Sequence, residues 1–433
     1  MHTVTRMLKR ILTLAAGVGL GLGLALVAAR VALAWGFLPN RELDRSIGEV
    51  REVLQLVHEN YVEPKAADYG PLAKTAIHGL VESLDPHSEF LESKDYQVLE
   101  EELSGDFSGI GVQVEMRKGR VVVIAPIAGS PGERAGILRG DEIVRVDGQA
   151  LPRGLSMDAV IDRLRGQPGT RVTVGLLRPA TGRSFELTLQ RELIQQASVR
   201  DVRVLPAHTG YLQITEFSDH TGEEFATALN HLLKEGIDSL VIDLRGNPGG
   251  LLDAAVEVAE PFFRKNELIV FTQGRQPADR EDYRAAADGE PLTLPVAVLI
   301  NAGSASAAEV VTGALKDTHR AVIVGERSFG KGSVQSIFKL KHGAGLRLTT
   351  ARYFTPGGVS IHEKGITPQV EVVMTPEEDR QLRLQRLRPD VTDPRDFKER
   401  FGFTPIADRQ LQAALDVLKG VQLLAAAPTP GAP

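Results

Sequence analysis

Apolar and polar residues follow different periods along this 433-residue chain, and each change of period marks a new region. Residues 41–104 repeat apolar side chains every three or four positions, which predicts an N-terminal helical region. Residues 105–193 contain short alternating runs between Gly-rich turns, which predicts a β-rich module. Residues 194–375 alternate strand-like and helical runs, as an α/β core does, and residues 376–433 predict charged helical segments. The chain is therefore expected to be a multidomain α+β protein.

The α/β region gives the sharpest element boundaries. Continuous apolar runs predict buried strands, and runs with helical spacing predict the helices between them. The predicted strands are 210–214, 239–245, 296–300, 321–325 and 346–354, and the predicted helices are 222–234, 251–263 and 304–316. Residues 273–292 are polar and contain Pro and Gly, which predicts a surface excursion. The Ala/Pro-rich residues 423–433 predict a disordered tail.

The N-terminal 35 residues predict a membrane segment. Arg6, Lys9 and Arg10 precede the run 11–29, which is 19 residues long and apolar or small apart from Thr13. That length suffices for a membrane span, and the basic flank favours a cytoplasmic N-terminus. We expect an uncleaved single-pass anchor with the rest of the chain outside the cytoplasm. Ala32-Leu-Ala34 also fits a signal-peptide cleavage site, so a cleaved, secreted form is the alternative.

The composition limits which cofactors, metal sites and partners are expected. An apolar content of 42% and a charged content of 24% are typical of folded proteins, and a net charge of −6 gives no indication of a nucleic-acid partner. The absence of Cys excludes disulfides and thiolate ligands. His362-Glu363 does not form an H-E-x-x-H motif, and no other metal-ligand spacing is present. No metal or organic cofactor is expected.

Ser306 is the candidate nucleophile. It follows a predicted buried strand and lies near the start of the predicted helix 304–316, where backbone N–H groups favour negative charge. A hydroxyl there can attack once a base takes its proton. Lys331 is the candidate base, because a buried lysine with a lowered pKa can be neutral, and Phe329 is expected to help bury it. Gln335 is expected to orient the Lys331 amine, which completes a variant of the catalytic triad.

Glycine loops suggest two binding functions. Residues 246–250, G-N-P-G-G, follow a predicted strand but lack the Lys-Ser/Thr of a phosphate-binding P-loop. The N–H groups of Ala307 and of Gly249 or Gly250 could instead hold an oxyanion, and the sequence does not decide between the two glycines.

Residues 105–193 resemble a PDZ domain, and Phe107-Ser-Gly-Ile-Gly-Val112 resembles the carboxylate-binding loop of that domain. Successive N–H groups of that loop can bind a terminal carboxylate, and the adjoining strand edge can add a peptide as a further strand. The loop residues expected to bind substrate are Gly109, Ile110, Gly111 and Val112. Arg165 follows the predicted helix 156–164. It is either a cationic helix C-cap or a link between peptide binding and the catalytic centre.

Four segments resemble the C-terminal processing peptidases, also called tail-specific proteases. They are S-A-S-A-A-E at 304–309, F-G-K-G-S-V-Q at 329–335, D-L-R-G-N-P-G-G at 243–250 and L-D-P-H-S at 84–88. In that family the second Ser of S-A-S is the nucleophile and the Lys lies twenty-five residues later, as Ser306 and Lys331 do. This chain has Ala308 where the family usually has a third Ser, and Gln369 where it usually has an acidic residue. Neither departure affects the nucleophile or the base.

The resemblance covers about residues 49–369 and implies an exported serine endopeptidase with a crotonase/ClpP-like α/β core. Its substrates would be proteins with free apolar C-termini, held by the PDZ-like module. An adaptor or a homo-oligomer is compatible with this interpretation. Two other functions remain open: an inactive peptide-binding scaffold of the same fold, and a crotonase-like acyl-CoA enzyme, which would leave the PDZ-like module and the export segment without a role.

Overall fold

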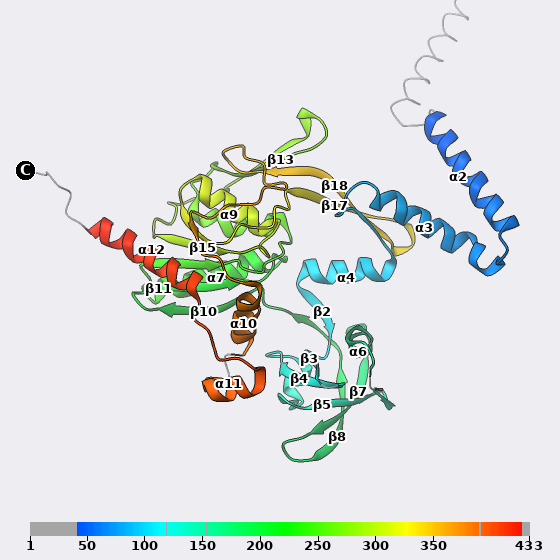
Figure 1. Cartoon of the computed structure of the whole chain (residues 1–433), viewed down its shortest axis with the longest axis horizontal. Helices are drawn as coiled ribbons and strands as arrows, with labels where there is room; N and C mark the ends of the chain where they lie inside the picture. Colours follow the sequence, from blue (N-terminus) through cyan, green and yellow to red (C-terminus); the bar gives the residue numbers. More distant parts are fainter. Residues whose placement is uncertain (1–40, 118, 153, 389–390, 427–433) are drawn as a thin grey trace, which may run out of the picture. The chain divides into compact units, whose positions relative to one another are not determined.

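The protein is described by a computed structural model that covers residues 41–117, 119–152, 154–388 and 391–426 (Figure 1). The chain divides after Pro86 into two compact units. The predicted anchor at 11–29 lies outside the described residues. Among the residues that the structure describes, none of the helices combines the length and the apolar character that a membrane span requires.

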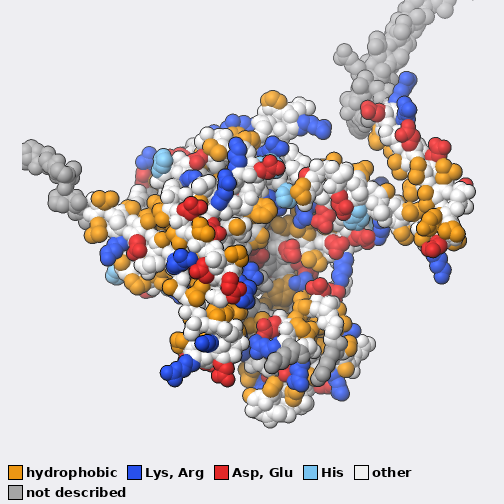
Figure 2. Space-filling view, viewed as in Figure 1, with side chains coloured by type: hydrophobic (Ala, Val, Ile, Leu, Met, Phe, Trp, Pro, Cys, Tyr) orange, Lys and Arg blue, Asp and Glu red, His pale blue; other side chains and the backbone are white. Residues whose placement is uncertain are grey.

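The first unit is helical, as predicted. It contains α2 (Arg41–Asn60), a 3-10 turn η1 (Pro64–Ala67) and α3 (Tyr69–Glu82). The His58 ring stacks on Tyr69 with 4.2 Å between centroids, and its Nδ1 lies 2.8 Å from the Ala67 carbonyl oxygen. None of the α2 side chains is buried, and Figure 2 shows apolar side chains along that helix. The exposed ones are Leu43, Ile47, Val50, Val53 and Leu56.

The second unit begins with β1 (Glu89–Leu91), α4 (Ser93–Ser104) and β2 (Asp106–Gly109). A PDZ-type β-module follows, with a five-strand path β3-β4-β5-β7-β8 and the helix α6 against it. Its bounds are β3 Val112–Arg117, β4 Arg120–Pro126, α5 Pro131–Arg134, β5 Glu142–Val146, β6 Gln149–Ala150, α6 Met157–Leu164, β7 Arg171–Arg178 and β8 Arg183–Gln190. Ser156 caps α6, and its oxygen accepts a hydrogen bond from the Ala159 N–H. The predicted β-rich module and its helix are confirmed.

The α/β core is built on a six-stranded sheet in the order β10-β11-β12-β15-β16-β19, parallel except for the β10–β11 pair. The strands are β10 Val199–Leu205, β11 Thr209–Ile214, β12 Ser239–Asp243, β15 Val296–Ile300, β16 Ala321–Gly325 and β19 Val370–Glu371. Both faces are covered, as the continuous apolar runs require. One core cluster packs α7 (Thr221–Lys234), α8 (Leu252–Ala259) and α9 (Ala307–Asp317) on one face, and another packs α12 (Arg409–Ala426) on the other.

A second sheet has the order β1-β18-β13-β14, with β17 also paired to β18. Its strands are β13 Leu268–Gln273, β14 Arg280–Arg284, β17 Ser333–Lys339 and β18 Gly345–Phe354, and β9 (Glu192–Gln195) pairs separately with β2. The prediction of a surface excursion at 273–292 is wrong in part, because β14 pairs with β13 in this stretch. The strand is at the sheet edge and its side chains are mostly exposed, so it lacks the apolar alternation that marks a strand.

The C-terminal region forms α10 (Pro376–Leu387), α11 (Pro394–Phe401) and α12. The helix α12 runs to Ala426, so residues 423–426 are helical where a disordered tail was predicted. Leu and Ala favour helix, which accounts for this extension.

A buried ionic cluster ties the start of α12 to the end of β12. The Arg245 guanidinium donates to both oxygens of Asp243 and of Asp408, at 2.6–2.9 Å.

Candidate active site

Ser306 occupies the sharp turn between β15 and α9. Its backbone has φ 53° and ψ −115°, a conformation that a side chain other than Gly rarely adopts, and the residue is 7% exposed. Such strained positions concentrate at functional sites. The local sequence favours the turn because Ser306 and Glu309 have the spacing of a helix capping box, and the Glu309 carboxylate accepts from the Ser306 N–H at 2.9 Å.

Two asparagines lock this turn to the glycine loop after β12. The Asn301 Oδ1 accepts from the N–H groups of Gly246 at 2.8 Å and Gly303 at 3.0 Å. The Asn247 carbonyl oxygen accepts from the Ala305 N–H at 2.9 Å, and its side-chain oxygen accepts from the Gly249 N–H at 2.8 Å. The two loops thus form one hydrogen-bonded structure around Ser306.

Glu309 connects the nucleophile to the Lys331 loop. Its side chain is fully buried, and its carboxylate accepts from the N–H groups of Ser306, Gly330 and Lys331 at 2.7–2.9 Å and from the Ser328 hydroxyl. Burial raises the pKa of Glu309, and these hydrogen bonds oppose the rise. One carboxylate therefore fixes the backbone of both candidate catalytic residues.

Lys331 lines the same cavity as Ser306. Burial lowers the pKa of Lys331, and the positive charge of Arg347 lowers it further. No carboxylate of the described residues lies within ion-pair distance of Lys331. The expectation that Phe329 buries the lysine is wrong, since Phe329 is 63% exposed.

Gln335 lies on β17 and lines the cavity with Ser306 and Lys331. Its amide nitrogen donates to Ser333 Oγ at 2.9 Å and to Thr349 Oγ1 at 3.2 Å. In the described part of the chain its amide makes no hydrogen bond to Lys331. The structure brings the three predicted residues to one cavity, and the orienting contact of Gln335 stays a prediction.

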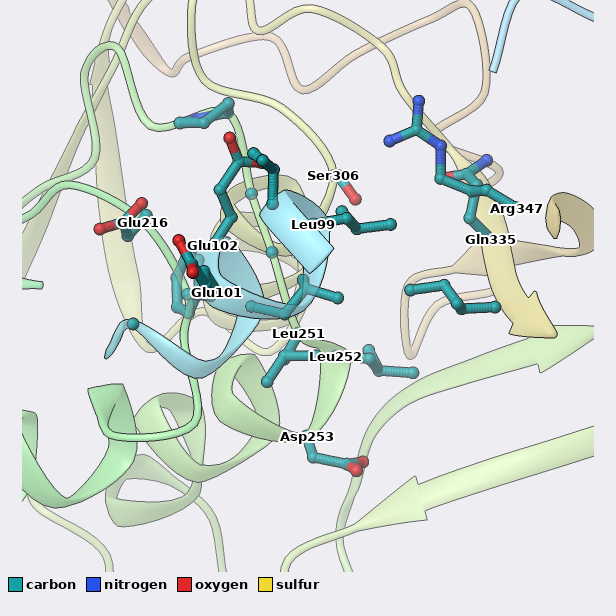
Figure 3. A pocket seen from close by; sticks show the side chains of 18 of the residues that line it. Leu99, Glu101, Glu102, Glu216, Leu251, Leu252, Asp253, Ser306, Gln335 and Arg347 are labelled. Atoms are coloured by element: carbon teal, nitrogen blue, oxygen red, sulfur yellow. The ribbon is translucent and has the colours of Figure 1, made fainter. Parts of the chain in front are cut away.

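The cavity has a volume of about 750 Å³ and is formed by segments far apart in the sequence. Figure 3 shows Ser306, Gln335 and Arg347 around it, with Leu99 and two glutamates of α4 on one side and residues from the start of α8 on another. Tyr353 on β18 also lines the cavity and is 4% exposed. Its hydroxyl interacts with Ser306, and burial raises the pKa of Tyr353 to about 12 although the Ser306 hydrogen bond opposes the rise.

The predicted oxyanion donors lie beside the nucleophile. Ala307 is the first residue of α9, so its N–H has no acceptor within the helix. A Cβ added to Gly249 would lie 2.7 Å from the Ser306 Cβ and 3.0 Å from the Ala307 nitrogen, so only Gly permits this approach. The Gly249 N–H, however, already donates to Asn247. Gly250 forms a bridge with Phe217, whose carbonyl oxygen would lie 2.0 Å from an added Cβ.

The PDZ-like loop lines a separate groove of about 250 Å³ between β3 and α6. Gly109, Ile110, Gly111 and Val112 all contribute to it, together with Ile161 and Leu164 of α6. Gly111 has φ 69°, and a Cβ there would lie 2.1 Å from the Ser130 Cβ, which explains the glycine. The groove thus lies between the edge strand β3 and the helix α6, and apolar side chains from both contribute to its lining.

Arg165 lies at the C-cap of α6 and lines both the groove and the large cavity. Its guanidinium donates to Glu101 Oε2 on α4 at 2.9 Å and lies 5.5 Å from the centre of the Phe107 ring. Both interpretations of this residue therefore have a structural basis, because it ends a helix and also contacts the wall of the cavity.

Sequence reasoning missed three residues of the site: Glu309, Arg347 and Tyr353. The capping-box spacing of Ser306 and Glu309 is visible in the sequence and could have identified the first. The other two reach the cavity only through strand pairing of β18. No local pattern indicates that pairing.

Comparisons with known proteins show which family the chain belongs to. The family model described as peptidase family S41 matches residues 208–372, and a PDZ domain model matches residues 122–178. The carboxy-terminal-processing protease of Bartonella bacilliformis is 35% identical over 372 residues, covering 84% of this chain and 83% of the relative. The chain belongs to peptidase family S41. It is a serine-type peptidase that carries a PDZ domain.

Other proteins similar to this S41 peptidase are also named as C-terminal processing proteases. The carboxy-terminal processing protease CtpB of Bacillus subtilis is 33% identical over 334 residues, which cover 76% of this chain and 68% of CtpB. Among solved structures, the photosystem II D1 C-terminal processing protease is 32% identical, with a TM-score of 0.42, and the match covers 74% of this chain and 91% of that one.

Proposed function

We propose that this S41 peptidase is an exported serine endopeptidase that recognises proteins by their C-terminal tails and cleaves them with a Ser306–Lys331 dyad. The observation that supports the dyad most strongly is Glu309. Its carboxylate binds the N–H of the nucleophile and the N–H of the base, and both residues line one cavity.

In the proposed reaction, neutral Lys331 takes the hydroxyl proton of Ser306 as the oxygen attacks a peptide carbonyl. The N–H groups of Ala307 and of Gly250 or Gly249 stabilise the oxyanion. We favour Gly250, because the Gly249 N–H is occupied by Asn247. Protonated Lys331 then gives its proton to the leaving amine, and water hydrolyses the acyl-enzyme with Lys331 again as base. Gln335 orients the lysine.

Substrates would enter by their free C-terminus. The groove at Gly109, Ile110, Gly111 and Val112 would hold the terminal carboxylate and an apolar side chain, with the peptide added alongside β3. The relatives named as carboxy-terminal processing proteases favour this use of the groove. Arg165 would report its occupancy to the catalytic cavity, because it lines both and pairs with Glu101 on α4.

The proposal about location rests on the sequence alone. We propose that residues 11–29 anchor the chain in the membrane with the catalytic part outside the cytoplasm, or that a signal peptide is cleaved to release it. An adaptor protein or a homo-oligomer would be compatible with either form.

The test is cleavage of an unfolded protein with an apolar C-terminal tail, compared with the same protein bearing an amidated C-terminus. Tail-dependent cleavage, lost on amidation, supports the proposal. Binding of the tail without cleavage would instead support the scaffold interpretation. Turnover of acyl-CoA thioesters without proteolysis would support the crotonase-like alternative.

A further inference from the structure

Arg347 and Glu89 form an ion pair at the wall of the catalytic cavity. Arg347 lines the cavity, and Figure 3 shows its guanidinium beside Gln335. Its Nη2 donates to Glu89 Oε2 at 2.6 Å. Its Nε is buried and has no hydrogen-bond partner among the described residues. Among the described residues, the guanidinium is therefore held by a single carboxylate, on one side.

Strand register creates this pair. The short strand β1 runs antiparallel to β18, and the register places Glu89 directly opposite Arg347. The residue before β1 is also linked to Gln335 through β18. Ser88 Oγ accepts from the Thr349 N–H at 3.1 Å, and Thr349 Oγ1 accepts from Gln335 at 3.2 Å. The L-D-P-H-S segment, whose Ser88 directly precedes β1, thus provides part of the support for the active site.

The other charged groups around the cavity are carboxylates and one further arginine. They come from α4, β2, the segment after β11, α8 and the end of α6: Glu101, Glu102, Asp106, Glu216, Asp253 and Arg165. Tyr283 and Tyr353 are neutral, since burial raises the pKa of both hydroxyls. Glu309 binds the backbone of Lys331. Burial is the larger cause of the lowered pKa of Lys331, and among these charges Arg347 is the one that lowers it further.

We propose that the Arg347–Glu89 pair sets how readily Lys331 gives up its proton, with Arg347 as a positioning residue that acts through the lysine and Glu89 as its counterion. The proposal rests on the proposed function of Lys331 as base. A nearby cation disfavours the ammonium form, so Arg347 increases the fraction of neutral lysine at a given pH. Glu89 moderates this effect because it neutralises part of the guanidinium charge.

The pair therefore predicts opposite effects from its two members. Arg347→Gln removes the cation, so the acidic limb of the kcat/KM profile should move to higher pH and activity on that limb should fall. Glu89→Gln leaves the guanidinium without its counterion, so the limb should move to lower pH. The double variant should return towards the wild-type profile, and Arg347→Lys should retain it. Arg352→Gln, an exposed arginine of the same strand outside the cavity lining, is the matched control and should not move the limb.

A second readout does not depend on proteolysis. In Ser306→Ala protein, acetylation of Lys331 by acetic anhydride, measured by mass spectrometry across pH, reports the pKa of that amine directly. The proposal predicts that Arg347→Gln and Glu89→Gln shift this labelling curve in opposite directions. Shifts in the same direction, or none, would overturn it. If the labelling curve shifts as expected while Lys331→Ala still cleaves substrate, the pair acts on the lysine and the assignment of Lys331 as base fails instead.

Discussion

Replacing Glu309 with Gln tests whether one buried carboxylate fixes the relative positions of the proposed catalytic residues Ser306 and Lys331. Glu309 Oε2 accepts from the N–H groups of Ser306 and Lys331, and Oε1 accepts from the Gly330 N–H and the Ser328 hydroxyl. In Glu309→Gln, one of these oxygens becomes an NH₂ group that faces two donors. Hydrogen bonds to charged groups contribute about 1.5–3 kcal/mol each, so the variant loses roughly 3–6 kcal/mol of interaction on that side.

The loss in stability should be smaller than this sum. Burial raises the pKa of Glu309, so ionising this carboxyl costs more in the folded state than in the unfolded state, and the ionised form lowers stability at pH values above its usual pKa. Removing the charge recovers part of that cost. We expect a net loss of about 1–3 kcal/mol in the free energy of unfolding, within the usual range for one substitution. Activity should suffer more, because a displacement of about 1 Å can cost about a hundredfold in rate.

The assay compares kcat/KM with the free energy of unfolding for Glu309→Gln and a matched control. Glu224 is suitable because its Oε2 also accepts several donors, the N–H groups of Ser198 and Val199 and the Ser198 hydroxyl, at 2.7–3.0 Å. It does not line the catalytic cavity. Glu224→Gln should lose comparable stability and keep its activity. If Glu309→Gln keeps kcat/KM within about threefold of wild type, against the hundredfold loss expected from displacement, the carboxylate does not position the dyad.

Three further substitutions have measurable consequences. Tyr353→Phe removes the hydroxyl that interacts with Ser306, so kcat should fall by about tenfold with little change in KM, the cost of one modest hydrogen bond to a reacting atom; an unchanged kcat would show that the hydroxyl only packs. Arg165→Ala breaks the contact with Glu101, so the dependence of cleavage rate on the C-terminal tail should weaken while the rate on untailed substrate is kept; unaltered tail dependence would leave Arg165 as a helix C-cap alone. Asp408→Ala leaves the buried Arg245 guanidinium with one carboxylate fewer, so urea denaturation should report a loss of about 3–5 kcal/mol. Burial opposes ionisation of Asp408, but Arg245 holds its pKa below the usual Asp value, so this stabilisation is present above the usual Asp pKa and is lost as the pH falls towards the lowered one; a difference in stability between wild type and Asp408→Ala that stays the same at acid pH would contradict the assignment.

The sequence predicted the elements whose signals are local. The predicted strand 296–300 has a continuous apolar run and matches β15, and the predicted helix 304–316 has periodic apolar residues and matches α9, which begins at Ala307. The edge strand β14 was missed because its exposed polar residues have no such period. Phe329 was expected to help bury Lys331, but its side chain is exposed, and this exposure depends on how the loop lies on the core.

In the candidate site, too, only the residues with local sequence signals could be predicted. Ser306, Lys331 and Gln335 could be placed in one site because their motifs are short and their spacing resembles that of a known family. Arg347 could not, because it reaches the cavity only when β18 pairs with β17, and it meets Glu89 only when a strand from 258 residues earlier joins that sheet. Pairings at such separations depend on the whole fold. They produce no periodic pattern in the sequence near either residue.

The most direct test of the central claim is the cleavage rate of an unfolded protein with an apolar C-terminal tail by wild type, Ser306→Ala and Lys331→Ala. Circular dichroism of each variant provides the control for folding. The dyad predicts cleavage by the wild type and loss of cleavage in both variants, with the fold retained. Cleavage by Lys331→Ala at the wild-type rate would show that another group takes the Ser306 proton.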